Sequence, residues 1–273
     1  MATIPPPSRL SGSEADIDYP TGDGKPVAET PIHYRNLKAA VETLDRHFQA
    51  EPMVYVWGNM LVFYEEGNRR KHVSPDTFVA LGVPKDKPRD NYLIWQEGHG
   101  LDLVIELTSK STKEEDLDHK MAIYRDIIGV SEYFLFDPRA EYLAPPLQGY
   151  RLREGQYERI QMVDGRLPSE VTGLHLERDG QWLRFYNPLT GRRLLTTEEL
   201  LLGERAERER AEAEREYAEA RCERAEAERE RAESERKLVA DQLEGSAHEV
   251  ERLRLELESW RRRFGSQSGE TPL

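Results

Sequence analysis

The sequence has very little cysteine and no long apolar run. Cys222 is the only cysteine among 273 residues, which excludes an internal disulfide framework and favours a reducing compartment. No stretch approaches the roughly 18 consecutive apolar residues that a membrane-spanning helix needs. The first residues, MATIPPPSRLSG, show no charged-then-apolar signal pattern. We therefore expect a cytoplasmic protein with no membrane partner.

Positively charged residues are outnumbered by negatively charged ones. The 39 lysines and arginines stand against 52 aspartates and glutamates, and the net charge is −13. This sign disfavours a broad nucleic-acid-binding surface, so any such contact would depend on a local basic patch and a bound metal ion. Hydrophobic residues make up only 37% of the chain and charged residues 33%, which indicates a charge-rich segment outside the globular core.

Composition divides the chain into four segments. Residues 1–29 are rich in Pro, Ser, Gly and Asp without hydrophobic periodicity, so we expect a disordered N-terminal arm. Residues 30–200 carry alternating strand and helix patterns and are the expected α/β domain. Residues 201–264 are predicted to form one long helix, and residues 265–273 a disordered tail.

The first elements of the expected domain are a helix and three strands. The helix is predicted to begin at Pro31, with Thr30 as its N-cap. Two β-rich runs, 54–57 and 60–64, are separated by Gly58-Asn59, which predicts a hairpin. A third strand is expected over residues 73–81.

The middle of the domain is predicted to be a strand–helix–strand unit. The runs 101–107 and 130–136 are mostly apolar, as expected of strands buried on both faces. Overlapping capping boxes predict a helix over residues 112–128 between them, ended by Gly129. Short antiparallel strands should follow from 149 to 186, with a hairpin turn at Asp179-Gly180.

Two acids lie next to these strands. Asp76 follows Pro75 at the start of an apolar run, and Glu106 closes the buried strand. A carboxylate at the end of a buried strand is costly unless something compensates it. Two such groups on neighbouring strands favour a divalent cation, and Mg²⁺ typically uses one or two carboxylates plus a substrate phosphate. The alternative is that both acids are solvated or salt-bridged.

The helices add a lysine and a histidine. A lysine at the border of the apolar face, such as Lys120, can keep its stem on the core and point its ammonium at the strand ends. Asp116 precedes Lys120 by four residues, so an ordinary helical salt bridge is the alternative. His33 on the first helix is a minor candidate ligand, because a lone helical histidine is more often a surface residue.

Taken in order, these motifs resemble the Uma2 family of restriction-type endonucleases, within the PD-(D/E)xK nuclease superfamily. The resemblance rests on Pro75-Asp76, Glu106-Leu107-Thr108-Ser109, Asp116, Lys120, Tyr124 and the run GVSEYFLFDP at 129–138, and covers roughly residues 30–200. It implies a restriction-endonuclease-like mixed sheet flanked by helices, one or two Mg²⁺ ions, and hydrolysis of phosphodiester bonds in nucleic acid, with DNA as the expected substrate.

The resemblance also implies roles for individual residues. Asp76, Glu106 and the main-chain carbonyl of Leu107 would bind Mg²⁺, which Mn²⁺ could replace, and Lys120 would join the two acids in catalysis. The superfamily usually has a lysine two residues after the second acid, where this chain has Thr108. The family commonly supplies its lysine from the following helix, which points to Lys120 and leaves Lys110 as the reserve.

The C-terminal segment has a heptad pattern. Thr196 and Glu199 form a capping box at its start. Positions 208 to 257 in steps of seven, and 211 to 260 likewise, give an a/d seam that is Ala- and Arg-rich in its first half and apolar in its second. We expect a homodimer through this coiled coil. The alternatives are a single charged helix held by Glu–Arg pairs, and a catalytically degenerate nuclease-fold scaffold that acts through the coil.

Overall fold

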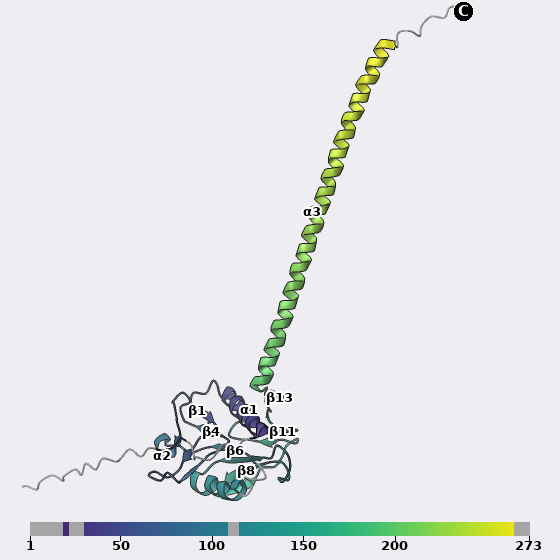
Figure 1. The fold of residues 1–273 in the computed structure, drawn as a ribbon. Coiled ribbons are helices and arrows are strands. Elements are labelled where there is room, and N and C mark those ends of the chain that lie inside the picture. Colours follow the sequence, from purple (N-terminus) through teal and green to yellow (C-terminus); the bar gives the residue numbers. More distant parts are fainter. Residues whose placement is uncertain (1–18, 22–29, 109–114, 265–273) are drawn as a thin grey trace, which may run out of the picture. The chain divides into compact units, whose positions relative to one another are not determined.

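The computed structural model describes residues 19–21, 30–108 and 115–264. The chain divides into two units, residues 1–201 and 202–273, which are treated separately below. The first holds all the strands, and the second consists of most of one long helix (Figure 1). Within the described residues, no helix combines the length and the apolar character needed to cross a membrane.

The first unit is built on a six-stranded mixed sheet. Only β6 and β7 run parallel, and every other neighbouring pair is antiparallel. All residues of these two strands are buried, as expected of central strands. The expected α/β class is confirmed. The strand order is β1 (Val54–Trp57), β4 (Thr77–Leu81), β6 (Leu103–Leu107), β7 (Glu132–Phe136), β8 (Leu147–Arg153), β9 (Gln156–Arg159).

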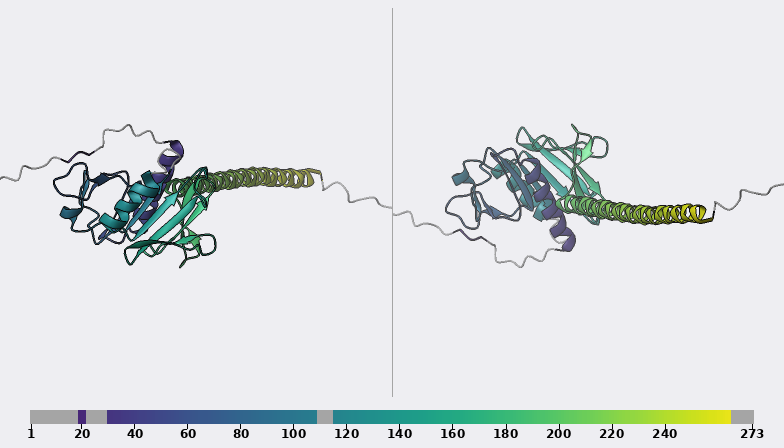
Figure 2. Two further views of the ribbon diagram at one scale, coloured as in Figure 1. Left: turned by 90° about the horizontal axis from the view of Figure 1, so that it is seen from below. Right: turned by 90° about the horizontal axis from the view of Figure 1, so that it is seen from above.

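Helical segments cover both faces of this sheet (Figures 1 and 2). Helix α1 (Pro31–His47) packs on one face through Ala40 and Leu44. The segments η1 (Glu115–Lys120) and η2 (Ile123–Ile128) lie on the other, where Ile123 and Tyr124 join a second core. Because successive side chains of a strand point to opposite faces, β6 and β7 contribute to both cores.

Two smaller sheets complete the unit. One has the order β10 (Leu167–Pro168), β11 (His175–Asp179), β12 (Trp182–Asn187), β13 (Arg192–Arg193). The other has the order β3 (His72–Val73), β2 (Val62–Phe63), β5 (Tyr92–Leu93), and the short helix α2 (Ile94–Glu97) follows β5. The hairpin predicted at Asp179-Gly180 is confirmed, since Asp179 pairs with Trp182.

The hairpin predicted at Gly58-Asn59 is wrong. Strand β1 pairs with β4, whereas β2 pairs with β3 and β5 in a different sheet. The main-chain N–H of Asn59 donates to the carbonyl of Pro75 (2.9 Å). Gly58-Asn59 therefore leads the chain away from β1 and does not turn it back along that strand. The strand predicted over 73–81 is likewise divided into β3 and β4, because Pro75 has no N–H to give to a ladder.

The helix predicted over 112–128 differs in type. Its described part forms two π-helical segments, η1 and η2, rather than one regular α-helix. Gly129 ends it in the left-handed conformation with φ of 76°, as predicted. Thr30 is confirmed as the N-cap of α1, since its Oγ1 accepts a hydrogen bond from the N–H of His33 (3.3 Å).

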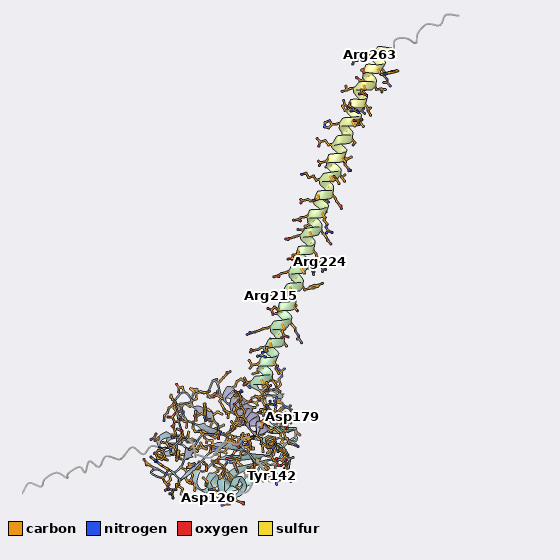
Figure 3. All side chains as sticks on the ribbon, viewed as in Figure 1. Asp126, Tyr142, Asp179, Arg215, Arg224 and Arg263 are labelled. Atoms are coloured by element: carbon orange, nitrogen blue, oxygen red, sulfur yellow. The ribbon has the colours of Figure 1, made fainter. Side chains whose placement is uncertain are left out.

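The long C-terminal helix, α3 (Thr197–Phe264), is confirmed. It begins with the predicted capping box: Glu199 N–H donates to Thr196 Oγ1 (3.3 Å), and Thr196 N–H donates to Glu199 Oε2 (2.8 Å). Side chains project outward along its length, with Arg215, Arg224 and Arg263 as examples (Figure 3). Pairing of this helix with a second copy stays a prediction.

Candidate active site

Asp76 lies at the end of the main sheet, immediately before β4. The antiparallel register pairs Thr77 with Ile105, which puts Asp76 beside Glu106 on the neighbouring strand. Asp76 Oδ2 accepts a hydrogen bond from the N–H of Leu107 (2.7 Å), and its Oδ1 lies 3.1 Å from Nε2 of His33. Its side chain is 15% exposed, so the carboxylate is fixed in place but open to solvent.

Glu106 is buried, with a side chain only 1% exposed, in a strand that is otherwise apolar. Its Oε2 accepts from Nζ of Lys120 (3.0 Å), and its Oε1 accepts from the hydroxyl of Tyr124 (2.7 Å). Both donors come from the helical segments that cover this face of the sheet. A buried carboxylate is tolerated only when it is paired and hydrogen-bonded, and this one has both kinds of partner.

Tyr124 is held in its protonated form. Burial raises the pKa of Tyr124 well above its ordinary value, and the negative charge of Glu106 raises it further. The phenol therefore remains a hydrogen-bond donor at any working pH. Its hydroxyl thus helps to fix the orientation of the Glu106 carboxylate.

Replacing Tyr124 by Phe should lower the free energy of unfolding by about 1.5 to 3 kcal/mol, the range for a hydrogen bond to a charged group. The ring would be retained, so the loss would come from the missing donor to Glu106. Urea denaturation of both proteins measures the difference. A matched change, Tyr217→Phe on α3, where the side chain is 70% exposed, should have no measurable effect. Equal stability of Tyr124→Phe and the wild type would contradict the assigned role.

The residues at this sheet end fit a hard divalent cation. No group of three or more His, Cys, Asp and Glu side chains is arranged to hold a metal in the described ranges. Asp76 and Glu106 carry carboxylate oxygens on neighbouring strands, and the main chain of Leu107 lies within hydrogen-bond distance of Asp76. Mg²⁺ prefers oxygen ligands, and often takes one or two carboxylates and completes its shell with water and substrate phosphate.

The structure brings Asp76, Glu106 and Lys120 to the same end of the sheet. Lys110, the reserve lysine, lies outside the described residues, as does the side chain of Asp116. Leu107 contacts Asp76 through its N–H. The catalytic and metal-binding roles of these residues remain predictions.

Thr108, which stands where the superfamily usually has a lysine, is buried, and its hydroxyl bonds to that of Tyr142. Two contacts were missed from the sequence. Tyr124 is predicted only as part of the family motif, without a polar partner, although its spacing of four from Lys120 puts both residues on one side of a helix. The contact of His33 with Asp76 joins residues 43 positions apart, and no local signal predicts it.

Comparisons with known proteins identify the family of this chain. The family model Uma2, described as "Putative restriction endonuclease", matches residues 8–182. A comparison with curated proteins gives no match. Among solved structures, the chain is similar to a protein described as a "putative nuclease belonging to DUF820" from Anabaena variabilis. The identity is 15% and the TM-score 0.42, over 55% of this chain and 79% of that chain. At these values the structural likeness supports no functional conclusion.

The family match is much more extensive. It spans well over half of the 273 residues and includes Asp76, Glu106 and Lys120. The mixed sheet flanked by helical segments agrees with the fold class that the resemblance implies. This chain therefore belongs to the Uma2 family.

Proposed function

We propose that this chain is a metal-dependent endonuclease that hydrolyses phosphodiester bonds, with DNA as its substrate. Membership of the Uma2 family supports a nuclease-like function. The single observation that supports the metal-dependent chemistry is the meeting of two carboxylates and a lysine at one end of the sheet. Asp76, Glu106 and the carbonyl of Leu107 would hold Mg²⁺, and Mn²⁺ could replace it.

The residues of the site would have separate roles in the reaction. When bound, the metal would neutralise the scissile phosphate and activate the attacking water. The N–H of Leu107 and the hydroxyl of Tyr124 keep the two carboxylates in fixed orientations. The ammonium of Lys120, 3.0 Å from Glu106, would stabilise the negative charge that develops on the phosphate oxygens.

A cleavage assay tests this proposal. Supercoiled plasmid, linear duplex and RNA would be incubated with the full chain in Mg²⁺, Mn²⁺ or EDTA. We expect cleavage of DNA that requires the metal and is lost in both Glu106→Gln and Lys120→Met. Cleavage that proceeds in EDTA, or that is unchanged in Glu106→Gln, would reject the proposal.

A scaffold without catalytic activity is the second candidate function. The net charge of −13 and the buried Thr108, hydrogen-bonded to Tyr142, favour it, because both depart from what a nuclease would be expected to have. Under that alternative, self-association through α3 would persist while no substrate was cleaved in any metal.

We also propose that α3 pairs with a second copy of itself through its second half. The apolar seam there is exposed in the single chain: Leu243, Val250, Leu253, Leu257 and Trp260 are each more than half exposed. An exposed apolar stripe repeating at heptad spacing is typical of a coiled-coil partner surface. The first half of the seam, which is Ala and Arg, should add little.

Charges beside the seam favour a parallel pair. In the parallel arrangement, Glu249 and Glu256 at g positions would face Arg254 and Arg261 at e positions of the second copy. Cys222, at an a position, would then share one layer with its counterpart, so mild oxidation should link the two chains. An antiparallel pair centred on the apolar half would keep the two cysteines apart.

Substitution of Leu253 by Asp should weaken association at least about tenfold, because it would place a charge in an apolar layer. Sedimentation equilibrium of the full chain measures the change. Leu255→Asp is the matched control: Leu255 is similarly exposed, at 60% against 51%, but lies at an f position outside the seam. Equal dissociation constants for the two variants would exclude this seam as the interface.

A further inference from the structure

An exposed tryptophan lies close to the candidate active site. Trp57 is the last residue of β1 and pairs with Phe78 of β4, which in turn pairs with Val104 of β6. Gly58, the next residue, lies directly against the main chain of Asp76, since a Cβ there would come within 2.2 Å of the Asp76 carbonyl oxygen. Trp57 is therefore at the same end of the sheet as the two acids.

Trp57 also lies on the same face of the sheet as Glu106. Its ring is parallel to that of Tyr55, two residues earlier, with centroids 6.2 Å apart and planes at 4°. Tyr55 belongs to the core beneath η1 and η2, together with Val104. Glu106 is two residues after Val104 and so points to that face as well.

The distance between Trp57 and the two acids suits a substrate that contacts both. Neighbouring strands are separated by about 4.8 Å and residues along a strand by about 3.3 Å, so the Cα atoms of Trp57 and Asp76 lie about 8 Å apart. A phosphate at the acids would bring a nearby base of the same strand within reach of the indole.

The indole is exposed and yet held in place. Trp57 is 48% exposed, which is high for a residue type that is mostly buried on average. Behind it, Tyr55 is fixed by the guanidinium of Arg89, 4.2 Å from its ring centroid, and by the ring of Tyr92. The Trp57 ring thus presents a preset flat surface to solvent at little cost in side-chain entropy.

From this placement we infer that Trp57 stacks on an unpaired nucleobase next to the phosphate that the proposed metal site at Asp76 and Glu106 would hold. The inference rests on the proposed nuclease function and names its substrate class: nucleic acid with a single-stranded or frayed segment at the cleavage site. Bases of an intact duplex are stacked on one another and do not offer a face. In a chain with net charge −13, stacking would supply affinity that backbone electrostatics cannot.

Binding measurements on the full chain test this inference. Fluorescence anisotropy in Mg²⁺ would follow a labelled single-stranded oligodeoxynucleotide and its duplex form in the Lys120→Met background, which prevents turnover and keeps both proposed metal ligands. Trp57→Leu should weaken single-strand binding about 5- to 150-fold, the range for the loss of one stacked base, and change duplex binding little. Trp57→Phe, which keeps a flat ring, should restore most of the affinity. In the active chain, Trp57→Leu should raise KM and leave kcat within about twofold.

Fluorescence quenching tests direct contact between Trp57 and the bound strand. In a chain whose other tryptophans (Trp95, Trp182, Trp260) are replaced by Phe, the fluorescence of Trp57 should be quenched by the single strand. If the Trp57→Leu variant binds the single strand as tightly as the chain that keeps Trp57, and the wild type cleaves, the inference is overturned and the nuclease function stays intact. Equal losses in Trp57→Leu and Trp57→Phe, with a lowered Tm, would reassign Trp57 to a structural role. Wild-type chain that neither binds nor cleaves would overturn both proposals.

Discussion

Substitution of Asp76 by Asn is expected to lower the rate of nucleic-acid cleavage at least about 100-fold, the scale of losing one group that stabilises transition-state charge. The amide oxygen of Asn can still accept the hydrogen bond from the N–H of Leu107, so the fold should be retained. What is lost is the negative charge that would hold the cation. Initial rates on plasmid DNA in Mg²⁺, together with Tm, separate the two effects.

Asp102 provides a matched control at the opposite end of β6. Its Oδ2 accepts from the N–H of Leu81 (2.7 Å) and lies 2.8 Å from Nε2 of His99, which repeats the contacts of Asp76 with a main-chain N–H and a histidine. Asp102→Asn should therefore cost similar stability and leave cleavage unchanged. If Asp76→Asn cleaves as fast as Asp102→Asn, the site has been assigned to the wrong residue.

Replacing Gly58 by Ala should be the most damaging change that adds only a methyl group. The new Cβ would lie 2.2 Å from the carbonyl oxygen of Asp76 and 2.9 Å from Cγ2 of Val41. The first contact is with main chain, so no side-chain rotation can relieve it. We expect the free energy of unfolding to fall by about 3 kcal/mol, at the upper end for overpacking. Cleavage should fall about 100-fold, because Asp76 must move.

Gly245→Ala is the matched control for this change. Gly245 lies inside α3, with nothing within 4 Å of the added Cβ. Alanine is a better helix former than glycine by about 1 kcal/mol, so this variant should stabilise its helix and leave cleavage unchanged. Urea denaturation and initial rates test both variants. A Gly58→Ala protein with wild-type stability and rate would show that the contact with Asp76 is not close.

The central strands were predictable because their signal is local. The apolar runs that form β6 and β7 are bounded by turn residues, and burial on both faces leaves them without alternation. The pairing of β1 was not predictable in the same way. Gly58-Asn59 is a strong hairpin signal, but the packing of Gly58 on Asp76 and the ladder between β1 and β4 override it.

In the candidate site, too, some residues were predictable from the sequence and some contacts were not. Asp76, Glu106 and Lys120 stand out because a charge beside a buried strand needs a compensating partner, and this argument requires only the sequence. The bond from Tyr124 to Glu106 and the contact of His33 with Asp76 depend on how helices settle on the two faces of the sheet. Such contacts between distant segments follow from packing, which no local pattern encodes.

The most direct test of the account is calorimetric titration of the full chain with Mn²⁺. The account predicts saturable binding that is lost in both Asp76→Asn and Glu106→Gln and retained in Asp102→Asn, because only the first two remove a proposed ligand. Binding to Glu106→Gln that matches the wild type, or no binding to any of the four proteins, would contradict a metal site formed by these two acids.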